Sequence, residues 1–216
     1  MVEGLDLYGA VTDLSLGKAE LESQKNGVLV TDVDVCKLPK VPEQIKKTLD
    51  VLEDSGLFAL SLVGSSPNED IQNVLSFTPR LPDLVFGNAR ELQFISGETD
   101  FNIGLRAVFP SAKLVVVTRA DQGAGIRLNG EILNVSARVI PQERVIDETG
   151  AGDTFMGTMM ASLLRNDVKD LRESHARRAA DLAAYASSLV IQSMHSRLTH
   201  GMAEQVNNYE RRIYDT

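Results

Sequence analysis

A run of small residues followed by an acid, Gly150-Ala-Gly-Asp153, is the part of the sequence best suited to chemistry. The small side chains of Gly150, Ala151 and Gly152 let the backbone approach a bound ligand closely. Apolar residues recur after this turn at near-helical spacing: Phe155, Met156, Met159, Met160, Leu163 and Leu164. The turn is therefore predicted to open a helix, whose first unpaired N–H groups and dipole favour a phosphate group. In such a site Asp153 can act as a general base that accepts the proton of an attacking hydroxyl.

A simpler interpretation of the same residues is a capped helix that follows a glycine turn. Asp153 would then only stabilise the positive end of the helix dipole. Asn88 and Glu91 also have a structural interpretation, because an asparagine followed three residues later by a glutamate is the spacing of a capping box. Glycine patterns and caps alone do not identify a site, so the surrounding sequence has to separate the interpretations.

The elements that must position these residues alternate along the chain. Strands are predicted over 27–35, 57–63, 83–86 and 113–118, the first of them buried, and helices are predicted over 41–56, 69–77 and 88–97. Residues 125–135 are predicted to form a hairpin that turns at Asn129 and Gly130. The chain after Gly157 is predicted to be helical to its end. This alternation is typical of βαβ units, so we expect a three-layer α/β/α sandwich with a mostly parallel sheet.

Two acidic residues, Asp32 and Asp34, lie near the C-terminal end of the first predicted strand. Open α/β sheets bind ligands at the carboxyl ends of their strands, which gives these acids a suitable position. Without a motif around them, we interpret both as solvated loop acids.

Residues 147–157, Asp-Glu-Thr-Gly-Ala-Gly-Asp-Thr-Phe-Met-Gly, resemble the C-terminal motif of the ribokinase-like (PfkB-type) kinases, D-T-x-G-A-G-D-x-F-x-G-G. Glu148 falls at a variable position, and Thr158 replaces the usual second glycine. The resemblance implies that Asp153 is the catalytic base. It also implies that the backbone amides of the three residues before Asp153 form an anion hole for the transferred phosphoryl group.

Two further motifs of that family are matched. Asn88 and Glu91 fit its N-x-x-E motif, in which the glutamate helps to hold magnesium; one glutamate suffices, because Mg²⁺ keeps waters and phosphate oxygens as ligands. Thr118 and Gly123 fit its T-x-G-x-x-G motif, which lies against the nucleotide phosphates, with Ala120 in place of the middle glycine. The resemblance thus implies ATP and Mg²⁺ as cofactors, with Glu91 at the metal and the following residues at the nucleotide: Asn88, Thr118, Gly123, Gly150 and Gly152.

The resemblance extends from about residue 27 to about residue 192, and we interpret 1–216 as a single ribokinase-like domain in which 1–26 are poorly assigned. This region corresponds to the later part of a typical member. The G-G-x-x-x-N region that grips the substrate and the β-sheet lid are not found before Val28. We therefore expect a fold whose lid region is missing, with an exposed sheet edge that invites pairing with a second copy as a homodimer.

Composition narrows the range of partners. The net charge of −8 over 216 residues argues against nucleic acid or an anionic membrane. No apolar run reaches the ~20 residues of a membrane span, and the N-terminus does not resemble a signal peptide. The single cysteine, Cys36, excludes an internal disulfide and favours a cytoplasmic location. The histidines are too scattered to predict a zinc site.

The sequence therefore predicts an ATP-dependent kinase that phosphorylates a hydroxyl group of a small molecule. A sugar is the expected acceptor, since the resemblance is to carbohydrate kinases. A nucleoside kinase is an alternative, because Phe86-Gly87-Asn88 is similar to adenosine-kinase-like members. A non-catalytic remnant that binds a nucleotide or a protein partner is a second alternative, because Ala120 and the early part of the chain depart from the family pattern.

Overall fold

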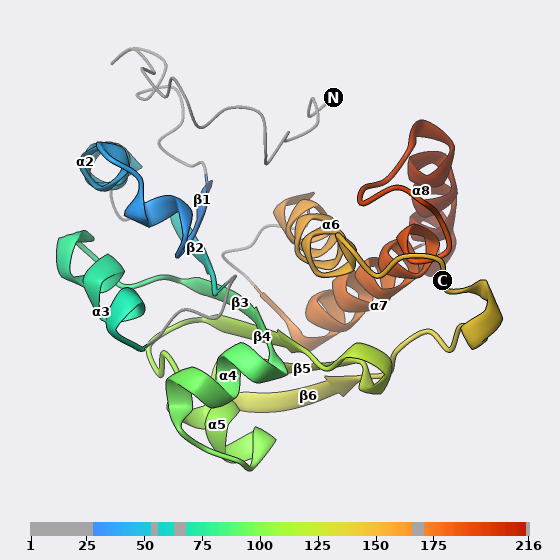
Figure 1. The fold of residues 1–216 in the computed structure, drawn as a ribbon, viewed down its shortest axis with the longest axis horizontal. Coiled ribbons are helices and arrows are strands. Elements are labelled where there is room, and N and C mark those ends of the chain that lie inside the picture. The colour runs from blue at the N-terminus through green and yellow to red at the C-terminus, as the bar shows by residue number, and fades with distance from the viewer. Residues whose placement is uncertain (1–27, 53–55, 63–67, 166–170, 215–216) are drawn as a thin grey trace.

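The computed structural model describes residues 28–52, 56–62, 68–165 and 171–214. Within them, six strands form one sheet in chain order: β1 (Val28–Asp32), β2 (Leu57–Ser61), β3 (Leu84–Asn88), β4 (Leu114–Thr118), β5 (Ala124–Leu128) and β6 (Glu131–Val135). Strands β1 to β4 are parallel, and β5 and β6 continue the sheet as an antiparallel hairpin (Figure 1). The predicted α/β class with a mostly parallel sheet is confirmed.

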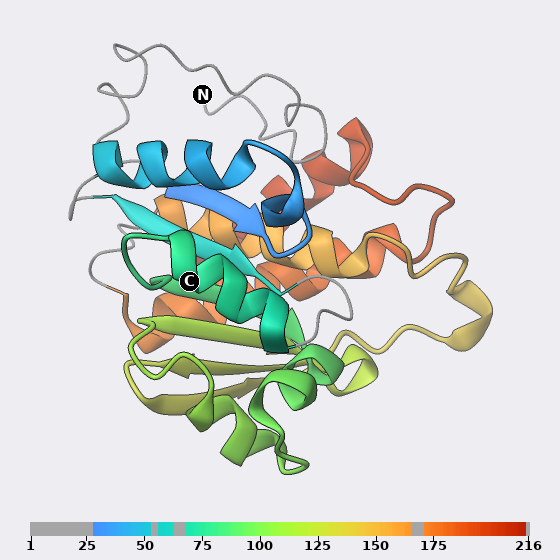
Figure 2. The same cartoon turned by 60° about the vertical axis from the view of Figure 1, so that its left-hand side comes forward.

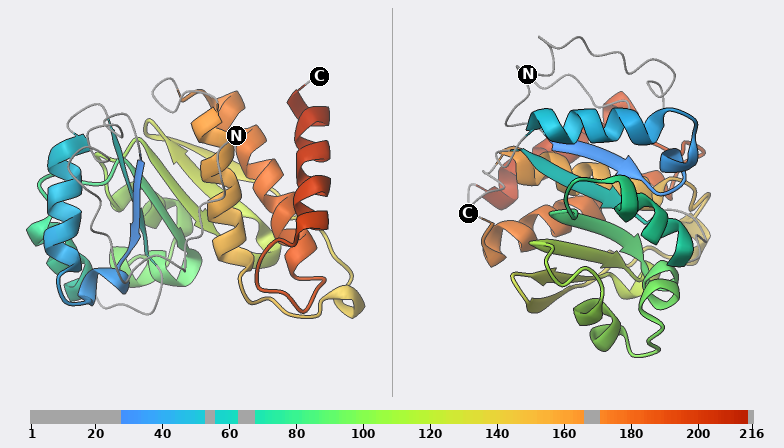
Figure 3. Two further views of the ribbon diagram at one scale, coloured as in Figure 1. Left: turned by 90° about the horizontal axis from the view of Figure 1, so that it is seen from above. Right: turned by 90° about the vertical axis from the view of Figure 1, so that its left-hand side faces the viewer.

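Helices cover both faces of this sheet (Figure 2). One face carries α2 (Val41–Leu52), α3 (Asn68–Phe77), α4 (Ala89–Ser96) and α5 (Phe101–Ala107). The other face carries α6 (Ala151–Arg165) and α7 (Glu173–Val190), and α8 (His200–Tyr214) packs on α7. The view from above in Figure 3 shows the resulting layers. Short 3-10 turns join some elements: η1 (Val35–Lys37), η3 (Ala120–Gln122) and η4 (Gln142–Arg144).

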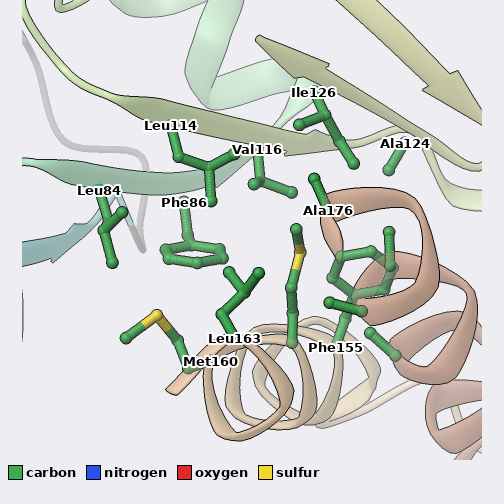
Figure 4. Packing of buried hydrophobic residues seen from close by; sticks show 14 of the residues in the cluster. Leu84, Phe86, Leu114, Val116, Ala124, Ile126, Phe155, Met160, Leu163 and Ala176 are labelled. Atoms are coloured by element: carbon green, nitrogen blue, oxygen red, sulfur yellow. The ribbon is translucent and has the colours of Figure 1, made fainter. Parts of the chain in front are cut away.

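The alternation of side chains along the strands divides the core into two clusters. Phe58 and Leu60 of β2 face the helices α2 to α5, whereas Ala59 between them faces α6 and α7. On the α6 side, Phe86 of β3 packs with Leu163 of α6 (Figure 4). Burial on both faces of the sheet explains why the strand sequences are nearly continuous apolar runs rather than alternating ones.

Three details differ from the sequence prediction. Strand β1 is half-buried rather than buried, because in the described part of the chain it pairs with β2 alone. The chain is not helical throughout after Gly157, since residues 191–199 connect α7 to α8 without helix. Helix α5 was not predicted; its N-cap is Asp100, whose side chain accepts a hydrogen bond from the Ile103 N–H at 2.9 Å. Residues 1–26 lie outside the described residues.

The fold brings the carboxyl ends of the parallel strands to one edge of the sheet. The strand register pairs Asp32 with Ser61, Ser61 with Phe86, and Asn88 with Thr118. Ligands of open α/β sheets bind along this edge. Across the described ranges, no helix is long and apolar enough to cross a membrane.

Candidate active site

A cavity of about 200 Å³ lies where the carboxyl ends of β2, β3 and β4 meet the start of α6. It brings together predicted site residues from three separate motifs: Asn88, Glu91, Thr118, Gly152 and Asp153. Its remaining lining is Ser61, Phe86, Gly87, Val116, Phe155 and Met156. Convergence of the motifs on one cavity is a property of the fold, because the residues are far apart in the sequence.

The glycine turn before α6 contains two glycines with different surroundings. Gly150 has φ +79°, and a Cβ atom there would lie 1.8 Å from the carbonyl oxygen of Ser196. This position therefore accepts only glycine, for reasons of backbone conformation and of space. Gly152, in contrast, has no atom within 4 Å of the place where a Cβ would be. Gly152 thus lines the cavity without being crowded by neighbouring atoms.

Hydrogen bonds hold the segment that leads into this turn. The carbonyl oxygen of Ile191 accepts from the N–H groups of Ile146 and Asp147, at 2.8 and 3.3 Å. The Asp147 carboxylate accepts from the Thr149 N–H at 2.9 Å, and this hydrogen bond lowers the pKa of Asp147. The loop after α7 and the Asp147 side chain therefore fix where the turn begins.

Asp153 lies in the first turn of α6 with a raised pKa. Asp153 is exposed as a residue, but its carboxyl group is partly desolvated, which is the main cause of the raised pKa; the negative charge of Asp32 is the second. Both effects make Asp153 a stronger proton acceptor than an ordinary aspartate, which suits a general base. Asp32 lies at the end of β1, where its Oδ1 also accepts a hydrogen bond from the Val35 N–H at 2.6 Å, so this carboxylate holds its own turn as well as raising the pKa of Asp153.

The pair Asn88 and Glu91 forms the capping box that the spacing predicted. The Asn88 side chain accepts from the Glu91 N–H at 3.0 Å, and the Asn88 N–H donates to Oε2 of Glu91 at 2.8 Å. Gly87 leaves room for this carboxylate, since a Cβ there would lie 3.0 Å from Oε2. The structural interpretation is therefore confirmed. The same buried carboxylate also lines the cavity, so the cap does not exclude the predicted metal role.

The turn after β4 contributes one side of the site. Thr118 lines the cavity, and its hydroxyl donates to the Gly87 carbonyl oxygen at 3.4 Å. Ala120 adopts φ +50°, the left-handed conformation that the glycine of the motif would favour. Gly123 does not line the cavity; it has φ +86°, and a Cβ there would lie 2.0 Å from the Val135 carbonyl oxygen. Crowding against β6 explains Gly123 without a ligand.

Sequence reasoning missed the apolar part of the lining and one hydroxyl. Ser61 ends β2 between the strands that carry Asp32 and Phe86, and only its place at the end of a strand could have indicated it. A second, more open cavity of about 510 Å³ shares Asn88 and Thr118 with the first. Its lining includes Arg119, whose guanidinium lies 4.5 Å from the ring centroid of Phe101. Together the two cavities offer room for a ligand larger than a phosphate.

The residues at the cavity fit a metal ion that is coordinated mainly by water and by the phosphate oxygens of a bound molecule. In the part of the chain that the structure describes, no group of three or more His, Cys, Asp or Glu side chains could hold a metal ion by itself. Magnesium does not need such a group, because it retains waters and binds few carboxylates together with phosphate oxygens. Glu91 at the cavity is compatible with that mode of binding.

Comparison with known proteins establishes the family. The model of the pfkB family carbohydrate kinases matches residues 11–200. The chain therefore belongs to this family, and the class predicted from the sequence is confirmed. One solved structure of similar fold is a fructokinase from Vibrio cholerae O395 in a form with bound fructose, ADP and calcium ion. It has 21% sequence identity to this chain and a TM-score of 0.66, with 84% of this chain on 61% of that one.

Individual relatives differ in the substrates their names give. A cytidine kinase of Thermococcus kodakarensis is 36% identical over 84 residues, which are 38% of this chain and 30% of that protein. A fructokinase of Klebsiella pneumoniae is 32% identical over 118 residues, which are 53% of this chain and 36% of that protein. The chain thus spans about a third of the length of these curated relatives.

Solved structures of low identity confirm the fold. A probable sugar kinase from Rhizobium etli CFN 42 superposes with a TM-score of 0.70 at 20% identity, with 88% of this chain on 55% of that one. An adenosine kinase from Sinorhizobium meliloti also gives a TM-score of 0.70 at 20% identity, with 88% of this chain on 57% of that one. The ribokinase-like fold extends over nearly all of the chain and just over half of each of these structures.

Proposed function

We propose that this chain is an ATP-dependent kinase that transfers the γ-phosphoryl group to a hydroxyl group of a small molecule, with a sugar as the acceptor. The observation that carries the proposal is the convergence of Asp153, Gly152 and Glu91 on one cavity at the carboxyl edge of the sheet. A capped helix alone would not require an acid of raised pKa beside an open glycine and a buried glutamate. Membership of the carbohydrate kinase family supports the same chemistry.

In this proposal Asp153 accepts the proton of the acceptor hydroxyl as its oxygen forms a bond to the γ-phosphorus. The bond between that phosphorus and the bridging oxygen breaks, and ADP leaves with the electron pair. The carboxylate is suited to the task because desolvation and Asp32 raise its pKa above that of an ordinary aspartate, which makes it a stronger proton acceptor. Asp153 therefore supplies the base, while the backbone before it supplies charge stabilisation.

Of the three amides expected to form the anion hole, that of Gly152 belongs to a residue that lines the cavity, and it would stabilise negative charge on the moving phosphoryl group. The Ala151 N–H donates to the Glu148 carbonyl oxygen at 3.2 Å, and Gly150 and Ala151 do not line the cavity. Thr118 and Asn88 line the same cavity and would position the nucleotide phosphates. Glu91 would orient magnesium, which when bound offsets the charge of the phosphate oxygens. Positioning and electrostatics would supply most of the rate in this class of reaction.

A nucleoside is the second candidate acceptor. The observation that favours it is the local identity with a cytidine kinase, which is higher than that with the fructokinase. A non-catalytic remnant is opposed by the intact set of polar residues on the cavity. The expected homodimer and the cytoplasmic location stay predictions of the sequence.

The test uses the purified chain and its Asp153→Asn variant. Isothermal titration measures binding of Mg·ATP, and ADP release is then measured with a panel of sugars and nucleosides. We expect stimulated release with one acceptor class, and a loss of at least ~100-fold in turnover for Asp153→Asn with ATP binding retained, the scale of a lost general base.

The matched control is Asp50→Asn, which removes an exposed acid of α2 that lines neither cavity and should leave turnover unchanged. Stimulated release that survives in Asp153→Asn would contradict the role of this base. ATP binding without release for any acceptor would favour the remnant.

A further inference from the structure

One side chain on α7 reaches the backbone of the glycine turn. The hydroxyl of Ser187 donates a hydrogen bond to the carbonyl oxygen of Ala151 at 2.9 Å. Ser187 lies 36 residues from Ala151 in the sequence and is half-buried between α6 and α7. Neither a family motif nor the pattern of α7 singled it out.

The carbonyl of Ala151 and the N–H of Gly152 are two ends of one planar peptide group. A hydrogen bond accepted by the carbonyl therefore polarises the N–H at the other end and makes it a stronger donor, as in cooperative hydrogen-bond chains. The same bond restrains the plane of the peptide and hence the direction of the N–H. Gly152 lines the cavity and has no atom within 4 Å where a side chain would start.

Other contacts from the end of α7 fix the turn but act on different groups. Ile191 accepts from the N–H groups of Ile146 and Asp147, and the Ser196 carbonyl oxygen packs against Gly150. These contacts determine where the turn lies. The Ser187 contact falls on the peptide that joins Ala151 to Gly152, a residue that lines the cavity, so it bears on how well the Gly152 N–H serves as a donor.

We propose that Ser187 is a positioning residue of the anion hole, which acts through the Ala151 carbonyl to orient and strengthen the Gly152 N–H. The proposal rests on the proposed function and deepens it. A donor aimed at charge that develops during the reaction lowers the barrier more than it tightens binding of the ground state. Ser187 therefore affects turnover and the binding of a transition-state mimic more than it affects the binding of ATP or the acceptor.

The test compares Ser187→Ala with Ser187→Thr, which keeps a hydroxyl at the same position. Ser188→Ala is the matched control, because the Ser188 hydroxyl donates at 2.6 Å to the Tyr185 carbonyl oxygen within the same helix. We measure kcat and KM, and the affinity for ADP with and without aluminium fluoride, a mimic of the transferred phosphoryl group. Thermal unfolding shows whether each variant folds.

We expect Ser187→Ala to lower kcat by about 10-fold, less than the loss of a whole anion-hole donor, with KM within about twofold. Affinity for ADP with aluminium fluoride should fall by a similar factor, while affinity for ADP alone stays unchanged. Ser187→Thr should recover most of kcat, and Ser188→Ala should leave it unchanged. An equal loss in Ser188→Ala, or a Ser187→Ala variant with unchanged kcat, would overturn the proposal.

The outcome also separates this inference from the proposed function. If the wild-type chain shows no turnover with any acceptor, the proposed function fails, and the Ser187 variants are compared by their affinity for inorganic phosphate and for ADP with aluminium fluoride. Weaker binding in Ser187→Ala alone would still support the anion-hole role. Equal binding in both serine variants, or no binding of these anions to the wild type, would refute it.

Discussion

The turn before α6 and the turn after β4 have the same construction but different residues. Each contains a glycine at which a backbone carbonyl oxygen leaves no room for a side chain. This oxygen belongs to Ser196 at Gly150 and to Val135 at Gly123. Each also contains a second position where the family has glycine. The first turn keeps Gly152 there, whereas the second has Ala120. The two turns therefore separate glycines that the fold requires from glycines that a ligand would require.

Neighbouring backbone atoms crowd the glycines that the fold requires, whereas the space around Gly152 is open. A side chain at Gly150 or Gly123 would collide with backbone, so packing explains both glycines. No packing explains Gly152, whose missing side chain leaves a cavity open. The turn with the open glycine also carries Asp153, and we infer that the phosphoryl group is held there rather than at Ala120.

The largest expected effect comes from Gly150→Ala. The φ of +79° and the Ser196 oxygen at 1.8 Å from a new Cβ should together destabilise the fold by about 2–5 kcal/mol. Chemical denaturation of the variant and the wild type measures this difference. A free energy of unfolding within about 0.5 kcal/mol of the wild type would mean that the turn and the Ser196 loop are not packed together.

Gly152→Ala is the matched variant, because it adds the same methyl group two residues later. Stability should be kept or should rise by up to about 1 kcal/mol, since alanine favours helix over glycine. Turnover should instead fall by about 10- to 100-fold, because the methyl group would displace the phosphoryl group from its position. If both variants lost stability equally, the distinction between the crowded and the open glycine would be wrong.

An intermediate effect is expected from Asp32→Asn, which tests whether the first turn carries the chemistry. Asp153 must be ionised to accept a proton, so its raised pKa places the acid limb of kcat/KM above the pH of an ordinary aspartate. Removing the Asp32 charge should lower the pKa of Asp153 and move this limb to lower pH. The movement should be partial, because desolvation of the Asp153 carboxyl group is the larger cause of the raised pKa.

The control for this pH profile is Asp34→Asn. Asp34 stands two residues from Asp32 but is exposed and paired with Lys37 at 2.9 Å, so its removal should leave the limb in place. If the acid limb of kcat/KM moved equally in both variants, the shift would reflect the change in net surface charge and not a specific effect of Asp32. A limb that does not move in Asp32→Asn would show that Asp32 does not act on the catalytic group.

Much of the fold was predictable because its signals are local. The apolar runs of β2 and β4, the Asn129-Gly130 turn and the Asn88–Glu91 cap each depend on neighbouring residues. The residues of the cavity were predictable to the extent that they lie in motifs. The observed convergence of Asn88, Glu91, Thr118, Gly152 and Asp153 needed the sheet register in addition.

The remaining features depend on contacts between distant segments. Asp32 affects Asp153 only because β1 ends at the edge where α6 begins, and Ser187 reaches Ala151 only because α7 packs on α6. The break at 191–199 was missed because its sequence keeps residues that tolerate a helix, whereas the structure uses its carbonyls to hold the turn before α6. Such roles follow from three-dimensional position, which spacing in the sequence does not report.

The smallest expected effect comes from Ala120→Gly, which restores the family residue in the second turn. An alanine at φ +50° destabilises the folded state by about 1–2 kcal/mol through backbone strain, which glycine removes. Glycine also makes the unfolded chain more flexible, and this offsets about 0.4–1 kcal/mol of the gain. The variant should therefore be more stable by about 0.5–1 kcal/mol, a rise in Tm of roughly 1–4 °C for a chain of this size. Asn129→Gly is the control for stability: the φ of Asn129 is also +50°, but asparagine tolerates this conformation better than alanine, so the gain in stability should be smaller.

The affinity of Ala120→Gly for ATP should differ from that of the wild type by less than about twofold, because the backbone at Ala120 already takes the conformation that glycine favours. A rise in ATP affinity of tenfold or more would mean that the Ala120 methyl group blocks the nucleotide, and the second turn would then also belong to the phosphate site.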